Sequence, residues 1–284
     1  MERTLYLNEN DGITVKIDGP SLWIKERHRA GRRVPVRLIG QVIIAGNIKM
    51  ESGIVTLLSE RGVPVVFLSR GRGVTTTALA VNSTYSATRN KVLRLARSEK
   101  GQLRVKEWLC STRHNFKLSL LKKLFPAEAW KINEKGMKDR DIDRLLDSAL
   151  SHLPVPARQT GVAEREKIAI ITATLEGLFH ECVLKQIMDF ELDPHTGFIH
   201  LHQDFAFVKD LCYALEAERD YQLIQFFRGS LYERYFYKEK RCWTINSEGM
   251  KNIAVRFENR KKEVLKHIAL LLDEFFEILR EPLL

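Results

Sequence analysis

The chain has 284 residues, of which 44% are apolar, and it carries 46 lysines and arginines against 36 aspartates and glutamates. This length allows one large or two small domains, and the apolar share is enough for a buried core, which excludes a disordered chain. The formal net charge of +10 at pH 7 favours a polyanionic partner, although an ordinary basic protein is also compatible with it.

The cysteines and the apolar runs narrow the class of protein further. The four cysteines, at positions 110, 182, 212 and 242, form no C-x-x-C pair, so the sequence indicates neither a zinc ribbon nor a disulfide framework. The first residues do not resemble a secretory signal, and no apolar run has the length of a membrane span. We therefore expect a cytoplasmic protein with reduced thiols and no membrane association.

Residues 1–80 show the pattern of a small β-rich domain. Apolar residues alternate in short runs up to Leu38, and turns such as Asp18-Gly19-Pro20 separate them, which predicts a small antiparallel sheet. Two further apolar strands, 41–45 and 63–68, flank an amphipathic segment over 51–61 that is expected to be a helix ending at Gly62. The polar stretch 81–90 has no periodicity and is predicted to be a linker.

Residues 91–284 are predicted to form a larger all-α domain. Apolar residues recur at near-helical spacing through to Leu124, and a second long helix is expected over 164–190. The other face of the first helix is basic and includes Arg113 and Lys117, and Glu99 and Glu107 are the only acids between 89 and 127. Such a face is either solvated or a contact to the DNA backbone. The candidate DNA-binding residues are Arg94, Arg97, Lys122 and Lys123.

A turn after the second long helix carries the candidate chemistry. The helical pattern ends at Phe190, Pro194 and Gly197 punctuate a turn, and His200 then arrives in an apolar setting. Asp210 follows at the start of another apolar run. Ligands that come from different elements in this way are typical of a metal site, whereas a lone histidine on an apolar face is more often a satisfied core residue.

Three passages of the chain carry a family resemblance. They are L-D-P-H-T-G-F-I-H at 192–200 with F-V-K-D-L at 207–211, E-R-G-V-P-V-V-F at 60–67, and the passage 243–253 that leads into the last helix. Together they resemble the CRISPR-associated integrases, which are metal-dependent nuclease-integrases. The resemblance implies an α+β fold and the insertion of new spacer DNA into a CRISPR array by attack of a DNA 3′-hydroxyl. It also implies DNA (spacer precursor and repeat), a homodimer and a small ferredoxin-like protein as partners.

The resemblance also implies a metal site for Mg²⁺ or Mn²⁺. In the family, a glutamate from one helix, the histidine of the turn and an acid at the start of the next helix hold the ion. His200 and Asp210 match two of these positions. Tyr213 stands where a second acid is common, so Asp210 would serve alone or Glu216 would reach in from one turn further on.

The glutamate has no motif match, and two candidates stay open. Glu176 lies in the helix before the turn, one helical turn ahead of His180, and Glu166 is the alternative. We take Glu176, His200 and Asp210 as the predicted catalytic and metal-binding residues. A third possibility is that Glu176 simply faces solvent and has no role in the site.

Two other readings of the site are open. The chain is either an active enzyme or a degenerate family member that acts as a non-catalytic DNA-binding subunit, as Tyr213 and the missing glutamate motif suggest. The metal is the second open question, because a zinc site is also possible. His200 and His202 would share a face if 198–207 formed a hairpin strand, with His195 in the turn.

Overall fold

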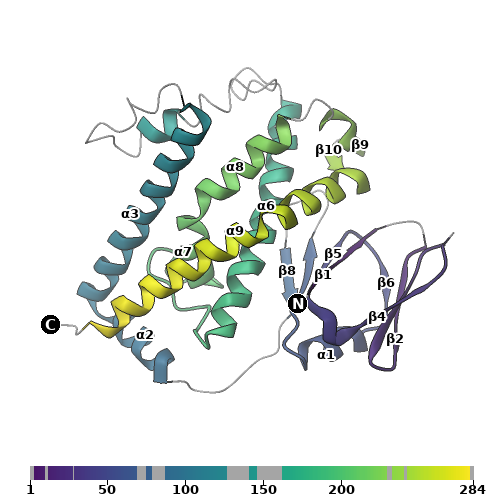
Figure 1. Ribbon diagram of the computed structural model, residues 1–284, viewed down its shortest axis with the longest axis horizontal. Helices are drawn as coiled ribbons and strands as arrows, with labels where there is room; N and C mark the ends of the chain where they lie inside the picture. The colour runs from purple at the N-terminus through teal and green to yellow at the C-terminus, as the bar shows by residue number, and fades with distance from the viewer. Residues whose placement is uncertain are drawn as a thin grey trace. The chain divides into compact units, whose positions relative to one another are not determined.

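The computed structural model in Figure 1 describes most of the 284 residues. The described ranges are 3–9, 12–27, 29–68, 75–78, 87–126, 141–145, 162–228, 232–239 and 242–281. Two compact units divide the chain. The first consists of Met1–Ser83, Glu166–Gly177 and Leu231–Val255, and the second of Thr84–Arg165, Leu178–Ser230 and Arg256–Leu284. The predicted α+β class, with an N-terminal strand-rich region before a helical one, is confirmed. The predicted linker falls largely outside the described residues.

Two four-stranded sheets build the first unit. One has the order β1 (Arg3–Asn8), β5 (Ile39–Ala45), β7 (Val65–Leu68) and β8 (Thr75–Ala78). The other has the order β4 (Arg32–Pro35), β3 (Ser21–Lys25), β2 (Thr14–Asp18) and β6 (Lys49–Met50). The antiparallel prediction is correct for β2, β3 and β4, but wrong for β1, which pairs in parallel with β5. All seven residues of β5 are buried, so this strand needs neighbours on both edges and β1 supplies one of them.

An apolar core fills the space beside these sheets. The predicted helix is observed as α1 (Gly53–Ser59), which buries Ile54 and Leu58. Gly62 has a φ of +66°, a left-handed conformation that glycine adopts without steric cost, and it ends this segment as the sequence predicts. The core residues are contributed by the strands, the 3-10 turn η1 (Val36–Leu38) and α1.

The first unit also contains a hairpin from late in the chain. The 3-10 turn η3 (Tyr232–Tyr235) leads into β9 (Phe236–Glu239), which pairs antiparallel with β10 (Cys242–Ile245). The Lys167 ammonium lies 4.4 Å from the centroid of the Trp243 ring, and the Ser247 hydroxyl donates to the Glu9 carbonyl at 3.1 Å. The helical region that follows the N-terminal strands therefore contains a two-stranded sheet in addition to its helices.

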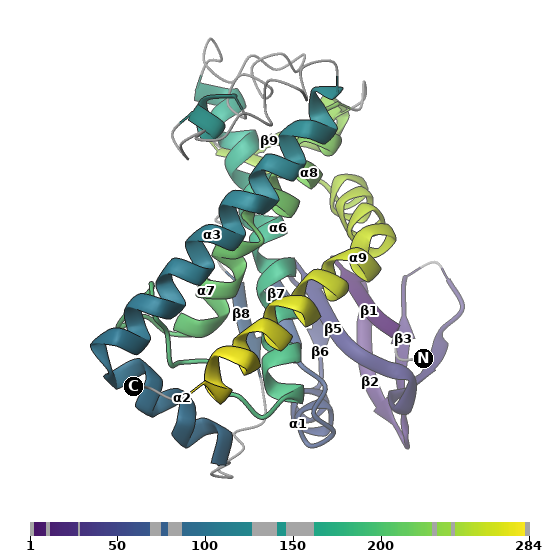
Figure 2. The same ribbon diagram turned by 60° about the vertical axis from the view of Figure 1, so that its left-hand side comes forward.

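Helices make up most of the described part of the second unit. They are α2 (Ala87–Arg97), α3 (Glu99–Leu124), α7 (Ala206–Ala214), α8 (Glu216–Phe227), the later parts of α6 (Val162–Asp189) and α9 (Ser247–Arg280), and the short helical stretch 141–145. The long helix predicted to start near residue 91 is interrupted at Ser98, whose backbone is extended and whose hydroxyl accepts the Gly101 amide at 3.3 Å. Serine at a helix N-cap supplies this bond, so one predicted helix becomes two. Figure 2 shows α3 on the outer side of the helical unit.

Aromatic side chains form the core beneath the turn that carries His200. The ring centroid of Phe275 lies 4.8 Å from that of Phe207, 5.9 Å from that of Phe198 and 6.1 Å from that of Trp108. The Trp108 indole donates to Glu274 at 2.6 Å, which satisfies its one polar atom. None of the helices, within the ranges that the structure describes, is long and apolar enough to cross a bilayer.

The cysteines differ in exposure and should differ in reactivity. Cys182 is buried in α6, and burial raises the pKa of its thiol to about 12, whereas Cys242 is exposed. Because the thiolate is the reactive species, iodoacetamide should alkylate Cys182 in the native protein roughly a hundredfold or more slowly than Cys242. Peptide mass spectrometry at timed quenches measures both rates. Equal rates in the native state would contradict the packing of α6, and equal rates in denaturant serve as the control.

Candidate functional site

The turn between α6 and α7 is held by its own polar residues. The Asp193 carboxylate accepts the His195 amide at 3.1 Å and the Thr196 hydroxyl at 2.9 Å. A Cβ at Gly197 would come within 2.5 Å of the Ala206 Cβ, so only glycine allows the turn to approach α7 this closely. The turn is therefore rigid where it delivers His200.

Asp210 is the anchor of this turn. Its side chain is fully buried, and its carboxylate accepts the backbone amides of Phe198 at 2.5 Å, of Ile199 at 3.2 Å and of His200 at 2.9 Å. The Oδ1 atom also lies 2.7 Å from Nδ1 of the His200 ring. Because a carboxylate accepts, Nδ1 is the donor of this bond, and in the neutral imidazole Nε2 then keeps its lone pair. This carboxylate–histidine pairing orients the imidazole in the manner of a metal ligand or a general base.

The same hydrogen bonds leave Asp210 poorly suited to bind a metal directly. Oδ1 accepts from the His200 amide and ring, Oδ2 accepts from Phe198, and the Ile199 amide lies within reach of both oxygens. The lone pairs of both oxygens are thus engaged, and a cation would have to compete with three amides. The structure brings His200 and Asp210 together as a hydrogen-bonded pair, and whether Asp210 also binds a metal stays a prediction.

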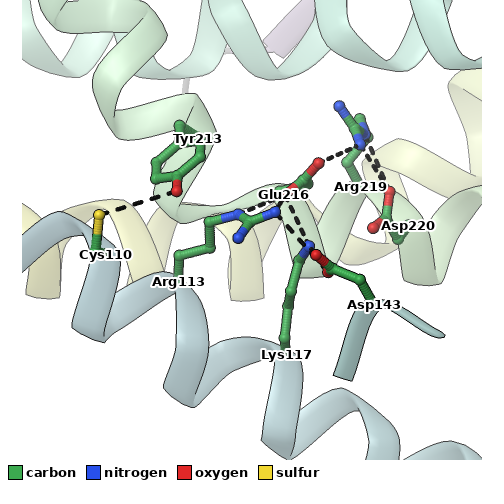
Figure 3. A network of polar contacts seen from close by, with 8 residues as sticks. All are labelled: Cys110, Arg113, Lys117, Asp143, Tyr213, Glu216, Arg219 and Asp220. Carbon is green, nitrogen blue, oxygen red and sulfur yellow. Dashed lines mark hydrogen bonds and ion pairs between the residues drawn. The ribbon is translucent and has the colours of Figure 1, made fainter. Parts of the chain in front are cut away.

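Tyr213 occupies the place one helical turn after Asp210 where an acid was expected. Its ring lies 6.2 Å from the His200 ring, edge on, and its hydroxyl is 3.9 Å from the Cys110 sulfur. The Arg113 guanidinium carbon is 4.7 Å from the centroid of the same ring. Figure 3 shows this tyrosine beside the α3 side chains. The neighbour of His200 is therefore an aromatic ring stacked against a cation.

Glu216 lies at the centre of an ion-pair network, shown in Figure 3. It contacts Arg113 at 2.6 Å and Lys117 at 3.0 Å, both from α3, and Arg219 at 3.1 Å. Lys117 also contacts Asp143 at 2.6 Å. Burial alone would raise the pKa of the Glu216 carboxyl, but Lys117 and Arg113 outweigh burial and hold that pKa below its usual range.

This network overturns two interpretations made from the sequence. Glu216 does not reach back towards His200, because α7 ends at Ala214 and α8 starts a new direction after Leu215. Arg113 and Lys117, which the sequence places on the basic face of the long helix, are turned inward and paired. The side chain of Lys117 is only 5% exposed, so it is not available to a phosphate.

The donor set around His200 does not fit a divalent metal ion. Within the described ranges, no group of three or more histidine, cysteine, aspartate or glutamate side chains is arranged to hold one. The zinc interpretation fails in the same way, because residues 198–205 form turns and not a strand, and His202 has a φ of +61°. Within the second unit, the described residues around this turn therefore supply one ring nitrogen, and a second ligand would have to come from elsewhere in the chain.

Both candidate glutamates lie in the part of α6 that belongs to the first unit. Glu176 is exposed there, and Glu166 accepts the Trp243 amide at 3.5 Å. His200 and Asp210 belong to the second unit. Whether Glu176 or Glu166 completes a site with His200 stays a prediction.

The four predicted DNA-binding residues are exposed, on two adjacent helices. Arg94 and Arg97 lie on α2, and Lys122 and Lys123 lie in the last turn of α3. Arg94, Arg97 and Lys122 have no acidic partner in the part of the chain that the structure describes, and the same holds for Lys123, whose ammonium lies 4.0 Å from the Tyr221 ring centroid. By contrast, Arg104 pairs with Glu281 and Arg89 contacts Asp193 at 3.5 Å.

Comparisons with known proteins support the family resemblance. The model of the family described as CRISPR associated protein Cas1 matches residues 5–148, just over half of the chain. No curated protein sequence matches. A Cas1 protein from Thermotoga maritima has a similar structure, with a TM-score of 0.71 at 16% identity over 100% of this chain and 98% of that one.

Two structures that contain DNA are also similar to the chain. A casposase bound to integration product has a TM-score of 0.69 at 19% identity, over 91% of this chain and 82% of that one. A TtCas1–DNA complex has a TM-score of 0.65 at 15% identity, over 99% of this chain and 92% of that one. At these identities the likeness establishes the fold.

Proposed function

Because the chain belongs to the CRISPR associated protein Cas1 family, a family of DNA integrases and nucleases, we propose that it binds DNA as a subunit of an integration complex. The observation that carries this proposal is the exposed basic set Arg94, Arg97, Lys122 and Lys123, which lacks acidic partners among the described residues. Exposed cations without internal partners are free to replace the counterions of a phosphate backbone. We therefore expect these four residues to make the main contacts with DNA.

The proposed role is that of a non-catalytic subunit. Asp210 is engaged by backbone amides, Glu216 by Arg113 and Lys117, and Tyr213 lies beside His200. These contacts compete with a metal ion for the acidic side chains near His200, and a single histidine does not hold Mg²⁺ or Mn²⁺ for strand transfer, which supports this role.

The second candidate function is that of a metal-dependent endonuclease and integrase that inserts spacer DNA by 3′-hydroxyl transesterification. The orientation of the His200 ring by Asp210 favours it, since metal-binding histidines are commonly held by a carboxylate in this way. On this candidate, Glu176, or Glu166 in its place, completes the site.

The similar structures support DNA and a Cas protein as partners. A casposase has been seen with an integration product, TtCas1 with DNA, and a further similar structure, with a TM-score of 0.69, is a Cas6-RT-Cas1–Cas2 complex. For this chain we propose spacer precursor and CRISPR repeat DNA, a homodimer formed through the strand-rich first unit, and a small ferredoxin-like partner protein.

Charge reversal of the basic set should weaken DNA binding strongly. Replacing Arg94, Arg97, Lys122 and Lys123 by glutamate is expected to lower the slope of log K against log salt by about 3 to 4, because each lost phosphate contact removes about 0.9. Fluorescence anisotropy with a labelled duplex over a salt series measures the slope.

A matched control separates this surface from net charge. Reversing four exposed lysines of the first unit and of early α9 changes the net charge equally, and these are Lys16, Lys25, Lys49 and Lys251. The control should keep most of the slope. Equal losses in the two variants would contradict the assignment of DNA binding to α2 and α3.

A strand-transfer assay decides between the two candidate functions. The pure protein is incubated with branched or supercoiled DNA in Mn²⁺, Mg²⁺ or EDTA, alongside His200→Ala. On the proposed function, DNA is bound but no product forms in any condition. Product that requires metal and disappears in His200→Ala would establish the second candidate.

A further inference from the structure

The turn that carries His200, residues 192–200, is tied to helix α2 by an ion pair. Nη2 of Arg89 lies 3.5 Å from Oδ2 of Asp193, and the two side chains are 35% and 9% exposed. The same Asp193 carboxylate accepts the His195 amide and the Thr196 hydroxyl within the turn. One carboxylate therefore joins the closure of this turn, called the His200 turn below, to the start of α2.

Helix α2 carries different side chains on its two sides. Val92 and Leu95 are buried, and Arg89, three residues before Val92, lies on their side of the helix. Arg94 and Arg97, which are also three residues apart, are exposed and belong to the proposed DNA-binding set. Because a packed helix moves as a rigid element, a ligand that fixes Arg94 and Arg97 also fixes the position of Arg89.

Backbone amides report whether the His200 turn is closed. The Phe198 and His200 amides donate to the Asp210 carboxylate at 2.5 and 2.9 Å, and the Phe205 amide donates to Nδ1 of His195 at 3.2 Å. These amides exchange their hydrogens with solvent when the turn opens and not while it is closed, so their exchange rates measure how often it opens. The order of the turn can therefore be measured separately from the affinity for DNA.

We propose that DNA bound to α2 holds the His200 turn closed through the Arg89–Asp193 pair. The inference rests on the proposed DNA-binding function, and it applies to either candidate function because it concerns the order of the turn and not a metal. Phosphates at Arg94 and Arg97 fix α2, and the fixed Arg89 guanidinium keeps Asp193 in the arrangement that closes the turn. Linkage makes the effect reciprocal, so the closed turn is the form that binds DNA more tightly.

Hydrogen–deuterium exchange of the full chain, with and without a saturating DNA duplex, tests this coupling. In the wild type, the amides of residues 195–207 should exchange about fivefold or more slowly when DNA is bound, which is the lower end of typical couplings between two sites. The affinity for DNA should change little when the pair is broken. The turn is already closed in the free protein, so the coupling acts on the rare open form and not on the form that binds.

Arg89→Gln and Arg104→Gln form a matched pair of variants. Each removes one positive charge from an arginine whose side chain is 35% exposed and which pairs with an acid, Asp193 in the first case and Glu281 in the second. Both should lower the DNA affinity by a similar, small factor, and only Arg89→Gln should lose the DNA-dependent slowing of exchange.

Asp193→Asn breaks the same pair from the other side. Its amide oxygen still accepts a hydrogen bond within the turn, but the side chain no longer carries the charge that attracts Arg89. This variant should also lose the DNA-dependent slowing. Because Arg89 and Asp193 act through one contact, the double variant Arg89→Gln with Asp193→Asn should lose no more of the effect than either single variant.

The outcomes separate this inference from the proposed function. If DNA binds but residues 195–207 of the wild type exchange at an unchanged rate, the inference fails and DNA binding stands. The inference also fails if Arg89→Gln keeps the slowing, because DNA would then cover the turn directly. If DNA does not bind, the proposed function fails and the inference falls with it. Circular dichroism checks the folding of Arg89→Gln, and Asp193→Asn decides the question if that variant is unfolded.

Discussion

Replacing Asp210 by alanine is expected to lower the free energy of unfolding by about 4 kcal/mol. The substitution leaves the buried amide of Phe198 and the partly buried amides of Ile199 and His200 without their acceptor, and it removes the partner of the His200 ring. An unsatisfied buried donor costs about 1–3 kcal/mol, so the loss greatly exceeds that of one hydrogen bond. Urea denaturation followed by circular dichroism measures it.

The neighbouring acid Asp204 provides the control for this substitution. Asp204 lies in the same connection between α6 and α7 but is exposed, so Asp204→Ala should change stability by about 0.5 kcal/mol or less. Asp210→Asn should lie between the two, because an amide oxygen still accepts while its NH₂ group opposes a donor. A loss below about 1 kcal/mol in Asp210→Ala would show that the turn does not depend on this carboxylate.

Replacing Glu216 by alanine should cost about 3 kcal/mol, because it leaves two largely buried cations, Arg113 and Lys117, with only the half-exposed Asp143 as a shared acidic partner. Glu248→Ala is the control, since it breaks a glutamate–arginine pair at the same 2.6 Å distance whose side chains are 58% and 49% exposed. That exposed pair should contribute less than about 1 kcal/mol. Thermal and urea unfolding of both variants measure the difference.

A second substitution tests whether the buried charge of Lys117 causes the loss of stability in Glu216→Ala. Adding Lys117→Met to Glu216→Ala replaces the more buried cation by an apolar side chain of similar length, and it should restore part of the lost stability. If the double variant is less stable than Glu216→Ala alone, Lys117 stabilises the fold through contacts other than this ion pair.

The stabilisation that Glu216 provides through Arg113 and Lys117 should depend on pH in a known direction. The folded state holds the pKa of Glu216 below its ordinary value of 4.5, so the stabilisation is fully present above that pH. It is lost as the pH falls through the lowered pKa. The difference in stability between wild type and Glu216→Gln should therefore close in acid and open towards neutral pH. A difference that grows in acid would reverse the assignment.

Local sequence patterns predicted the parts of the site that depend on short-range contacts. The turn at 192–200, with Gly197 and the His200–Asp210 pair, lies within one stretch of the chain, and its spacing carries the geometry. The direction in which the Asp210 carboxylate points, towards a metal ion or towards the backbone amides, depends on the backbone conformation of the turn. The spacing of residues in the sequence does not determine that conformation. Serine is a preferred N-cap residue, so a helix start at Ser98 could have been predicted. The apolar periodicity continues on both sides of Ser98, however, and it favoured one uninterrupted helix.

Long-range pairing could not be predicted. Arg113 meets Glu216 across 103 residues of sequence, so the periodicity of α3 alone made Arg113 and Lys117 look like part of an exposed basic face. In the same way, β1 was assigned to the antiparallel sheet because β2 follows it in the chain. Its partner β5 begins at Ile39, and only the burial of both faces of β5 requires that pairing.

The inward orientation of Arg113 and Lys117 also affects how ionic strength acts on this protein. Mobile ions screen charges in water but penetrate little into a packed helix interface, so the Glu216 network should be largely indifferent to sodium chloride. The solvent-facing cations of α2 and α3 have no such shelter. Added salt should therefore weaken DNA binding by the surface cations while the buried ion pairs of the helical unit stay intact. A salt titration of one sample then reports binding separately from folding.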